Sequence, residues 1–270
     1  MLAARKWQGR EATVIKEDRR PPSRRIADQL RKEIVQGVLK PGDQLPSERE
    51  LAVLHGAARN TAREAITILR NEGLVDAQHG KGVFVRERPT FLRLGAARYS
   101  RALRRETGLS PFDAELLQQH RRGHSDCTSV KRVRPPEDVA QRLGVSPKAR
   151  TVVERENWYY AEDAPVQVCW TYIPVGIAAG SVLARNADLG TGSIYARLED
   201  QGYPLATVRE EITARMPTPL EAQGLATSPG VPVIELLHTS YDPNGVAFEV
   251  TRFVMRADVM ALDYKVPVEQ

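Results

Sequence analysis

The sequence predicts an α+β protein of two domains, a helical N-terminal domain followed by a domain built on an antiparallel sheet. The first observation is a series of three amphipathic helix patterns, followed by a short hairpin pattern, within residues 23–86. The second is a series of paired strand patterns joined by tight turns between residues 130 and 262. The third is the length, because 270 residues suffice for two hydrophobic cores.

The charges are distributed unevenly along the chain. Residues 1–88 carry 18 basic and 12 acidic side chains, a net charge of +6, and residues 89–150 carry 13 and 6, a net of +7. Residues 151–270 carry 8 and 16, a net of −8. A basic front indicates a module that binds a polyanion, joined to a part with another role, although an unevenly solvated surface would give the same numbers.

Composition excludes several classes of protein. With 41% hydrophobic and 27% charged residues the chain is globular, and it contains no run of about 20 apolar residues that would span a membrane. The N-terminal residues lack the apolar core of a secretory signal. Two cysteines, Cys127 and Cys169, make no disulfide framework, so we expect a cytoplasmic protein.

The first two helix patterns carry recognisable end signals. Ser23 is positioned to cap a helix whose apolar positions recur every four residues up to Ile34, and Gly37 ends it. Ser47 and Glu50 form a capping box at the start of a second, short helix that runs to about residue 54.

The third helix pattern, residues 56–73, has two different faces. Its apolar stripe consists of Ala62, Ala65, Ile66 and Leu69, whereas its first turns carry Arg59, Asn60, Thr61 and Arg63. Ala58 stands where a capping Ser or Thr is expected, which weakens the helix start.

Strands around the glycine-rich tip 78–82 follow this helix, so residues 23–86 predict a winged helix-turn-helix, which inserts its third helix into the DNA major groove. Arginine pairs with guanine and asparagine with adenine. We expect DNA contacts at Arg49, Arg59, Asn60, Thr61, Arg63, His79, Gly80 and Lys81. The alternative is that these are ordinary solvent-facing side chains of a small helical domain.

The run 26–85 resembles the DNA-binding domain of the GntR family of bacterial transcription regulators. The resemblance rests on the motifs G-x-L-x-P-G-D-x-L-P-S-E-R-E-L-A (37–52), R-x-T-x-R-E-A (59–65) and G-K-G (80–82). It implies DNA contacts at Arg49, Arg59, Thr61, Arg63, His79 and Gly80. Ala57-Ala58 departs from the usual Val-Ser or Val-Thr.

The second half alternates strand and helix patterns, which indicates an antiparallel sheet with helices on one face. We expect strands from about 130, at 151–160, 166–173, 205–215, 233–242 and 248–256, and helices near 136–143, 193–202 and 218–226.

This half is similar to the UTRA effector domain of the HutC subfamily, through P-P-E-D-V-A-x-x-L (135–143), T-Y-I-P (171–174), S-I-Y (193–195) and E-V-T-R-F (249–253). The similarity implies a chorismate-lyase-like sheet that holds a small effector. The implied effector-binding residues are Arg155, Thr171, Ser193, Tyr195 and Glu249. Asn157, Cys169, Trp170 and Met255 depart from the family pattern, which predicts a larger, more apolar or aromatic effector rather than an amino-sugar phosphate, or the loss of ligand binding.

These observations predict four segments: a flexible basic arm (1–22), a winged helix-turn-helix (23–88), a linker (89–128) and a UTRA domain for effector binding and dimerisation (129–265). The predicted function is a homodimeric regulator, most simply a repressor, that binds a palindromic DNA operator and responds to a small molecule. No cofactor, resident metal or membrane partner is expected. The operator, the effector, the regulated genes and the sign of regulation are not determined by the sequence.

Three alternatives stay open at this point. An enzyme is disfavoured because the chain has no glycine-rich phosphate loop, no H-E-x-x-H motif and no nucleophile elbow. A metal-responsive regulator would use His120 and His124, whose spacing places two imidazoles on one face of a helix. A constitutive repressor would bind no effector at all.

Overall fold

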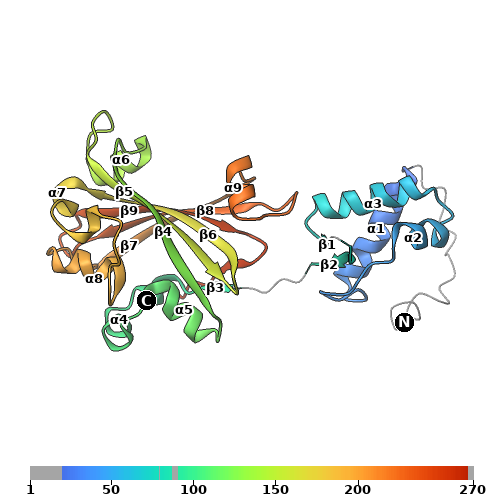
Figure 1. Ribbon diagram of the computed structural model, residues 1–270, viewed down its shortest axis with the longest axis horizontal. Coiled ribbons are helices and arrows are strands. Elements are labelled where there is room, and N and C mark those ends of the chain that lie inside the picture. The colour runs from blue at the N-terminus through green and yellow to red at the C-terminus, as the bar shows by residue number, and fades with distance from the viewer. Residues whose placement is uncertain (1–19, 79, 87–90, 267–270) are drawn as a thin grey trace. The chain divides into compact units, whose positions relative to one another are not determined.

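The computed structural model describes residues 20–78, 80–86 and 91–266, and the chain divides near residue 90 into two compact units (Figure 1). The first unit is helical with a small hairpin, and the second is built on an antiparallel sheet. The predicted fold class is therefore confirmed. Most of the predicted N-terminal arm, residues 1–19, lies outside the described residues.

The first unit packs three helices and a two-stranded hairpin around one core. Its elements are α1 (Pro22–Val35), α2 (Glu48–Leu54), α3 (Arg59–Asn71), β1 (Val75–Gln78) and β2 (Gly82–Val85). The predicted stripe of α3 is buried in this core, together with Leu30 of α1 and Leu51 of α2. Apolar burial of this kind is the main force that holds short helices in place.

The helix starts differ in how they are capped. The Ser47–Glu50 capping box of α2 is confirmed, since each side chain bonds the backbone amide of the other residue. The prediction that Ser23 caps α1 is wrong, because Pro21 is the N-cap and Ser23 is buried inside the first turn. Pro22 takes the first helical position, where its missing N–H leaves no bond unmade. Ala58 gives α3 no side-chain cap, as predicted.

The loop between α1 and α2 braces the wing. Gln44 pairs with Phe84 of β2, and its side-chain amide donates a hydrogen bond to the carbonyl of Lys81 at 2.8 Å. Gly82 has φ +125°, and a Cβ there would lie 2.5 Å from that amide nitrogen. Only glycine fits this position, so the wing tip is held against the loop.

The second unit contains a six-stranded antiparallel sheet in the order β4-β5-β6-β9-β8-β7, and a separate parallel pair, β3 and β10. The sheet strands are β4 (Gly123–Val133), β5 (Val152–Ala161), β6 (Ala164–Pro174), β7 (Thr207–Arg215), β8 (Val233–Tyr241) and β9 (Ala247–Arg256), and the pair is β3 (Phe91–Arg93) and β10 (Met260–Leu262). Strands β5 to β9 thus lie close to the residues that the sequence predicts, whereas β4 begins inside the predicted linker and β3 and β10 are not predicted.

Helices cover both faces of this sheet, which corrects the prediction of one covered face. One face packs against α6 (Glu137–Leu143) and Leu225, the residue after α9 (Pro219–Gly224). The other face packs against α5 (Pro111–Gln118), α7 (Val175–Ala178) and α8 (Ser193–Asp200). In Figure 1, α6 and α9 lie on the side of the sheet opposite to α5 and α4 (Arg101–Thr107). The two apolar faces of the strands require both layers.

Residues 91–122, which the sequence assigns to a linker, are folded into the second unit. They form β3, the 3₁₀ helix η2 (Gly95–Tyr99), α4 and α5. Phe91 and Phe112 are buried against the sheet, with ring centroids 5.4 Å apart. The basic composition of this segment gives no sign of burial, because the carboxylate that pairs with the buried Arg93 is Glu210, far away in the sequence.

Substitutions at the N-caps of α2 and α3 should change the stability of the protein in opposite directions. Ser47→Ala removes a cap and should lower the free energy of unfolding by about 1 kcal/mol. Ala58→Ser should raise it by a similar amount, because Ala58 (φ −70°, ψ 150°) has nearly the backbone geometry of Ser47 (φ −60°, ψ 158°). Urea denaturation of the full chain checks both, and a loss of stability in Ala58→Ser would contradict the assignment of this cap.

Candidate nucleic-acid interface and ligand cavity

The start of α3 presents polar side chains to solvent on the side away from its core stripe. Arg59 and Arg63 keep 69% and 57% of their side chains exposed, Asn60 is exposed, and Thr61 is half-buried. Since no side chain caps this helix, its first amides remain available to an outside acceptor. A helix N-terminus of this kind attracts anions such as phosphate.

Glu48, in the first turn of α2, holds the two arginines of α3 side by side. Its carboxylate accepts from Arg59 Nε at 3.1 Å and from Arg63 Nε and Nη2 at 2.9 and 3.0 Å. The hydrogen bond from Arg63 lowers the pKa of Glu48. Exposed ion pairs of this kind are weak, so the pairing orients the guanidinium groups at little cost to a later exchange of partner.

The remaining predicted DNA contacts lie on α2 and the wing. Arg49 is exposed on α2, and Gly80 and Lys81 are exposed at the wing tip. Gly80 has φ +71° and open space around its missing Cβ. His79 lies outside the described residues.

A cavity of about 500 Å³ lies in the second unit, on the sheet face that α5 and α8 cover. Its volume is in the range of small-molecule sites. The lining comes from the loop between α4 and α5, from β4, β5 and β6, and from the segment before α8, and includes Asp113, Asp126, Cys127, Arg155, Asn157, Tyr159, Thr171, Asn186, Asp188 and Ser193. Three of the five predicted effector residues, Arg155, Thr171 and Ser193, therefore line one cavity.

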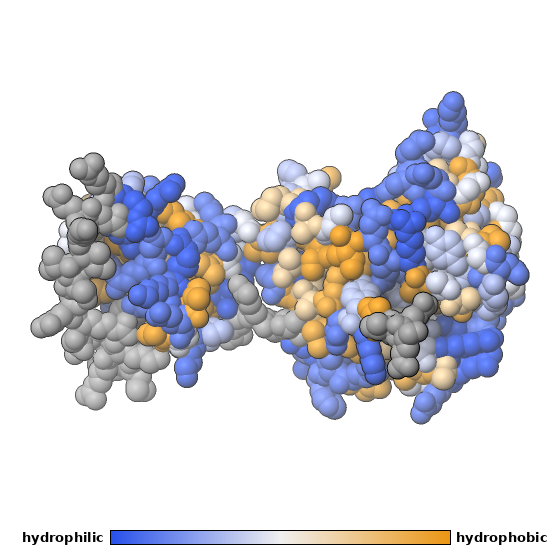
Figure 2. Space-filling model, turned by 180° about the vertical axis from the view of Figure 1, so that it is seen from behind, coloured by the Kyte–Doolittle hydropathy of each residue, from blue (hydrophilic) through white to orange (hydrophobic). Residues whose placement is uncertain are grey.

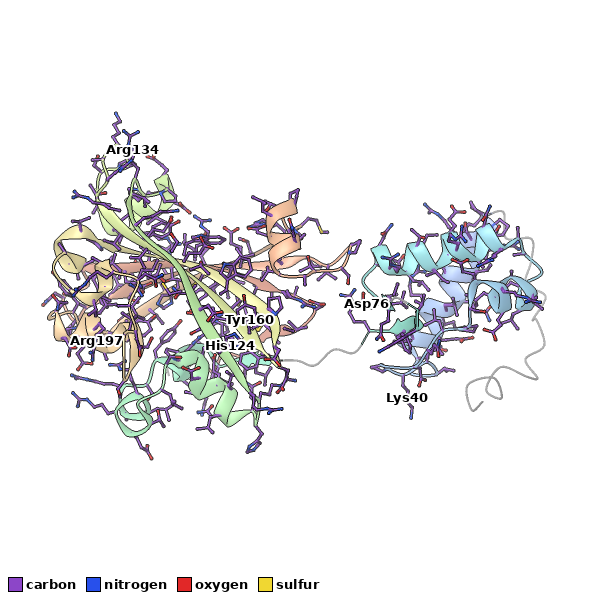
Figure 3. All side chains as sticks on the ribbon, viewed as in Figure 1. Lys40, Asp76, His124, Arg134, Tyr160 and Arg197 are labelled. Carbon is purple, nitrogen blue, oxygen red and sulfur yellow. The ribbon has the colours of Figure 1, made fainter. Side chains whose placement is uncertain are left out.

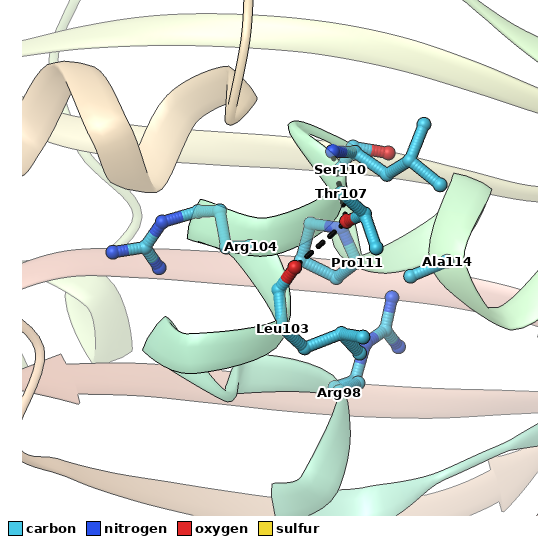
Figure 4. Close-up of a pocket in the computed structure, with 8 residues that line it drawn as sticks. Arg98, Leu103, Arg104, Thr107, Ser110, Pro111 and Ala114 are labelled. Carbon is cyan, nitrogen blue, oxygen red and sulfur yellow. Dashed lines mark hydrogen bonds between the residues drawn. The ribbon is translucent and has the colours of Figure 1, made fainter.

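A much smaller cavity, of about 10 Å³, lies between α4 and α5 beside Arg98, Thr107 and Ser110 (Figure 4). It has room for one water at most. Thr107 Oγ1 donates to the carbonyl of Leu103 at 2.8 Å, the bond drawn in Figure 4. This gap is a packing feature and not a ligand site.

Arg155 is buried on β5, where the protein already satisfies much of its guanidinium. Nη1 donates to the carbonyls of Leu183 and Arg185 at 2.9 and 2.8 Å, and Nη2 lies 3.6 Å from the sulfur of Cys127. Nε has no hydrogen-bond partner among the residues that the structure describes. Burial lowers the pKa of Arg155, yet an arginine stays charged in proteins.

A bulge in β4 brings Cys127 to this cavity. Cys127 pairs with Asn157, but Ser129 pairs with the adjacent Glu156, so Thr128 is the extra residue. Bulges re-aim the side chains around them. Sequence periodicity cannot locate such an irregularity, which is why the prediction does not include Cys127.

Tyr195 and Glu249, the other two predicted effector residues, lie behind the cavity wall. Tyr195 Oη is 3.2 Å from His238 Nε2, and Ser240 Oγ donates to Glu249 at 2.6 Å. Glu249 also accepts from Thr251, whose hydroxyl lies 2.7 Å from that of Thr171. Glu249 is therefore two hydrogen bonds behind the Thr171 side chain and does not line the cavity.

The same network continues to a buried ionic cluster that the sequence does not predict. His238 Nδ1 lies 3.0 Å from Glu210 Oε1, which also accepts from Arg93 at 2.9 Å and from Tyr99 at 3.0 Å. These four side chains come from β8, β7, β3 and η2. Glu115 of α5 lies close by, accepting from the Leu94 amide at 2.8 Å and pairing with Arg98 at 3.3 Å.

Trp170 and Met255, on which the prediction of an apolar ligand depends, lie away from the cavity. Trp170 packs on the opposite sheet face, with Val168 and Tyr172. Met255 is buried in the cluster around Phe91 and Phe112. The lining is instead rich in polar groups, so these departures from the family pattern do not make the site apolar.

The structure also removes the basis for a metal site at His120 and His124. His120 lies in a turn with φ +53°, and His124 lies on β4, where its ring stacks on Tyr160 at 4.7 Å between centroids (Figure 3). The two imidazoles do not share a helix face. In the described ranges, no group of three or more His, Cys, Asp or Glu side chains is arranged to hold a metal ion.

Comparison with known proteins identifies both units. The pattern "Bacterial regulatory proteins, gntR family" matches residues 22–85, and the UTRA domain pattern matches residues 118–261. The chain belongs to the GntR family of bacterial regulatory proteins. Its pairing of a GntR domain with a UTRA domain is the HutC-type arrangement that the sequence predicts.

Several GntR relatives align over nearly the whole chain. A helix-turn-helix regulator of Streptomyces coelicolor is 31% identical over 92% of this chain and 94% of its own length. The repressor NagR of Bacillus subtilis is 30% identical over 86% of this chain and 89% of its own. A crystal structure of a GntR-family regulator superimposes with a TM-score of 0.62 at 25% identity, covering 93% of this chain and 99% of the other. PhnF of Mycobacterium smegmatis shares the fold, with a TM-score of 0.56 at 22% identity and coverage of 90% and 100%.

These relatives are transcriptional regulators, and the chain is accordingly a DNA-binding regulator of the helix-turn-helix type. The described part of this GntR protein has no helix that is both long and apolar enough to cross a membrane.

Glu115 makes stability depend on pH. Burial raises the pKa of its carboxyl group to about 7, above the ordinary value of 4.5. As the pH rises, the unfolded chain loses this proton first, so the contribution to stability is full below pH 4.5 and is lost as the pH rises through about 7. Glu115→Gln should remove this loss, so that the variant gains roughly 3 kcal/mol relative to the parent between pH 4.5 and 8.

Urea denaturation over this pH range provides the measurement, and Glu210→Gln is the matched control. Burial opposes ionisation of Glu210, but the His238 hydrogen bond and the Arg93 charge outweigh it and lower its pKa. Its stabilisation is therefore present above pH 4.5 and is lost as the pH falls, the opposite sign. A parent and a Glu115→Gln variant with parallel profiles would contradict the shift at Glu115.

Proposed function

We propose that this protein is a ligand-responsive repressor that binds a palindromic DNA operator as a homodimer in the cytoplasm. The observation that carries the proposal is the uncapped start of α3, where Arg59, Asn60 and Arg63 are exposed. In helix-turn-helix proteins this part of the third helix reaches base edges in the major groove. Arginine there pairs with guanine and asparagine with adenine.

The ion pairs with Glu48 favour this role over that of a solvated surface. They hold Arg59 and Arg63 next to each other, so less side-chain entropy is lost when the guanidinium groups bind DNA. Arg49, Lys81 and Gly80 supply phosphate contacts in the proposal, and His79, which the structure does not describe, completes the set that the sequence predicts. Thr61, half-buried beside them, adds a hydroxyl.

The effector in this proposal binds the cavity of the UTRA domain. Arg155, Thr171 and Ser193 contact it directly, whereas Tyr195 and Glu249 support the wall from behind. An effector that binds one arrangement of the dimer more tightly shifts the population toward that arrangement and changes operator affinity. A binding protein, and not an enzyme, is what this arrangement supports.

Dimerisation through the UTRA domain is supported by its surface. It exposes large apolar side chains, among them Ile212, Met216 and Leu220, at 44%, 58% and 81%. Figure 2 shows apolar side chains gathered on part of the visible face of this unit. A contiguous patch of apolar side chains marks a surface that pairs with another protein. Two-fold symmetry of the protein demands a two-fold operator.

Selection of bound sequences from random duplex DNA, with the purified full-length protein, tests the proposal. It should enrich an inverted repeat whose half-sites have a fixed spacing. Enrichment of no motif, with only salt-sensitive binding to all duplexes, would contradict a sequence-specific operator.

Arg59→Ala and Arg63→Ala should each weaken binding to the selected duplex by roughly 1–3 kcal/mol, because each removes a base contact. Fluorescence anisotropy measures the loss. Arg209→Ala is the matched control, since Arg209 is equally exposed, at 62%, but lies on β7. Equal losses in all three variants would show that the effect is general charge and not base recognition.

Lys81→Ala should weaken binding to all duplexes about equally, since a phosphate contact carries no sequence information. The slope of log affinity against log salt concentration should fall by about one. Anisotropy titrations at several salt concentrations give this slope. An unchanged slope would remove the wing tip from the interface.

A further inference from the structure

The charges around the UTRA cavity are unusual for a site that would hold an acidic effector. Three carboxylates line it, those of Asp113, Asp126 and Asp188, against a single cationic side chain, Arg155. No lysine is among the lining residues. At neutral pH the side chains of the lining therefore carry two more negative than positive formal charges, which favours a cation, although the uncapped start of α8 at Ser193 also borders the cavity.

The one cation is also poorly placed to hold an anion. Nη1 of Arg155 is already bonded to the Leu183 and Arg185 carbonyls, whose negative ends face it. Nε has no partner among the described residues, and Nη2 faces only the weak sulfur acceptor of Cys127. One edge of the guanidinium is therefore left for a ligand oxygen, while Nη1 is already used by the protein.

The carboxylates, in contrast, keep acceptor capacity for a ligand. Asp113 accepts from Ser110 Oγ at 2.6 Å through Oδ2, and Asp188 accepts from the Gly190 amide at 2.8 Å through Oδ1. Each has its second oxygen for another donor. The carboxylate of Asp126 lies 3.7 Å from His124 Nε2, and 58% of the Asp126 side chain is exposed. A contact this long and this exposed does not neutralise the carboxylate. Asn157 and Asn186 add amide groups that suit hydroxyls.

We propose that the effector of this protein is a small polar molecule with a protonated amine and no phosphate. Its amine binds the Asp113, Asp126 and Asp188 side of the cavity, and an oxygen acceptor of the same molecule meets Arg155 Nε. This inference rests on the proposal that the cavity is the effector site. Hydroxyl groups of the ligand would pair with Asn157, Asn186 and Thr171.

Cys127 allows the charge preference of the cavity to be measured without knowledge of the effector. It lines the cavity and is partly exposed, whereas Cys169 is buried and burial raises the pKa of its thiol to about 12. Only thiolates react readily with methanethiosulfonates, so the reagent should label Cys127 selectively. Cys127→Ser, which should not be labelled, verifies the site of reaction.

The experiment compares the cationic aminoethyl and the anionic sulfonatoethyl methanethiosulfonate on the full-length protein. Each rate is divided by the rate of the same reagent with a small neutral thiol. We expect the cationic reagent to be favoured by at least about tenfold at low salt, and the preference to shrink with added salt. The double variant Asp126→Asn, Asp188→Asn should lose most of it, while Asp200→Asn, an exposed change on α8 outside the cavity, should keep it.

Each outcome decides the proposal. A faster reaction of the anionic reagent would show that Arg155 dominates the cavity and would overturn an amine ligand. Equal rates would also overturn an amine ligand, because they would show that the electrostatic potential of the cavity does not favour a cation. Neither result bears on DNA binding, so failure of this inference is distinguishable from failure of the proposed regulator, which the selected operator sequence tests on its own.

Discussion

The UTRA domain depends on one buried carboxylate, that of Glu210 on the edge strand β7. It accepts from Arg93, Tyr99 and Tyr264, at 2.9, 3.0 and 2.5 Å, and lies 3.0 Å from His238. These partners come from β3, η2, the end of the described chain and β8. An ionised carboxylate is stable away from water only when such donors surround it. The segment from residue 91 onward must therefore fold with the sheet, and part of this segment, including Gly108, Ser110 and Asp113, lines the cavity.

The ion pairs described in the two units differ in how far they are buried. In the UTRA domain the Arg93–Glu210 ion pair is buried, and it holds β3 against β7. In the helix-turn-helix the Glu48 pairs are exposed and weak, so Arg59 and Arg63 are oriented and still able to change partner. A fixed cavity in one unit and exchangeable surface contacts in the other suit the regulator that we propose.

Patterns within a short stretch of sequence predict the features that depend only on neighbouring residues. The stripe of α3, the Ser47 capping box and the strand positions follow from periodicity and end signals, and the structure confirms them. The folded state of residues 91–122 is not predictable in this way, because Arg93 is neutralised by a carboxylate 117 positions away. The face on which Trp170 packs, and the exclusion of Glu249 from the cavity, depend likewise on pairing across the sheet.

The central claim is that the start of α3 and the wing of this GntR protein contact DNA. Hydrogen–deuterium exchange of the full-length protein, with and without its selected duplex, tests this claim most directly. The account predicts slower exchange on binding at the start of α2, in the first turns of α3 and at the wing tip, with little change across the sheet strands β5, β6 and β9. Protection confined to the UTRA domain, or an unchanged α3, would contradict it.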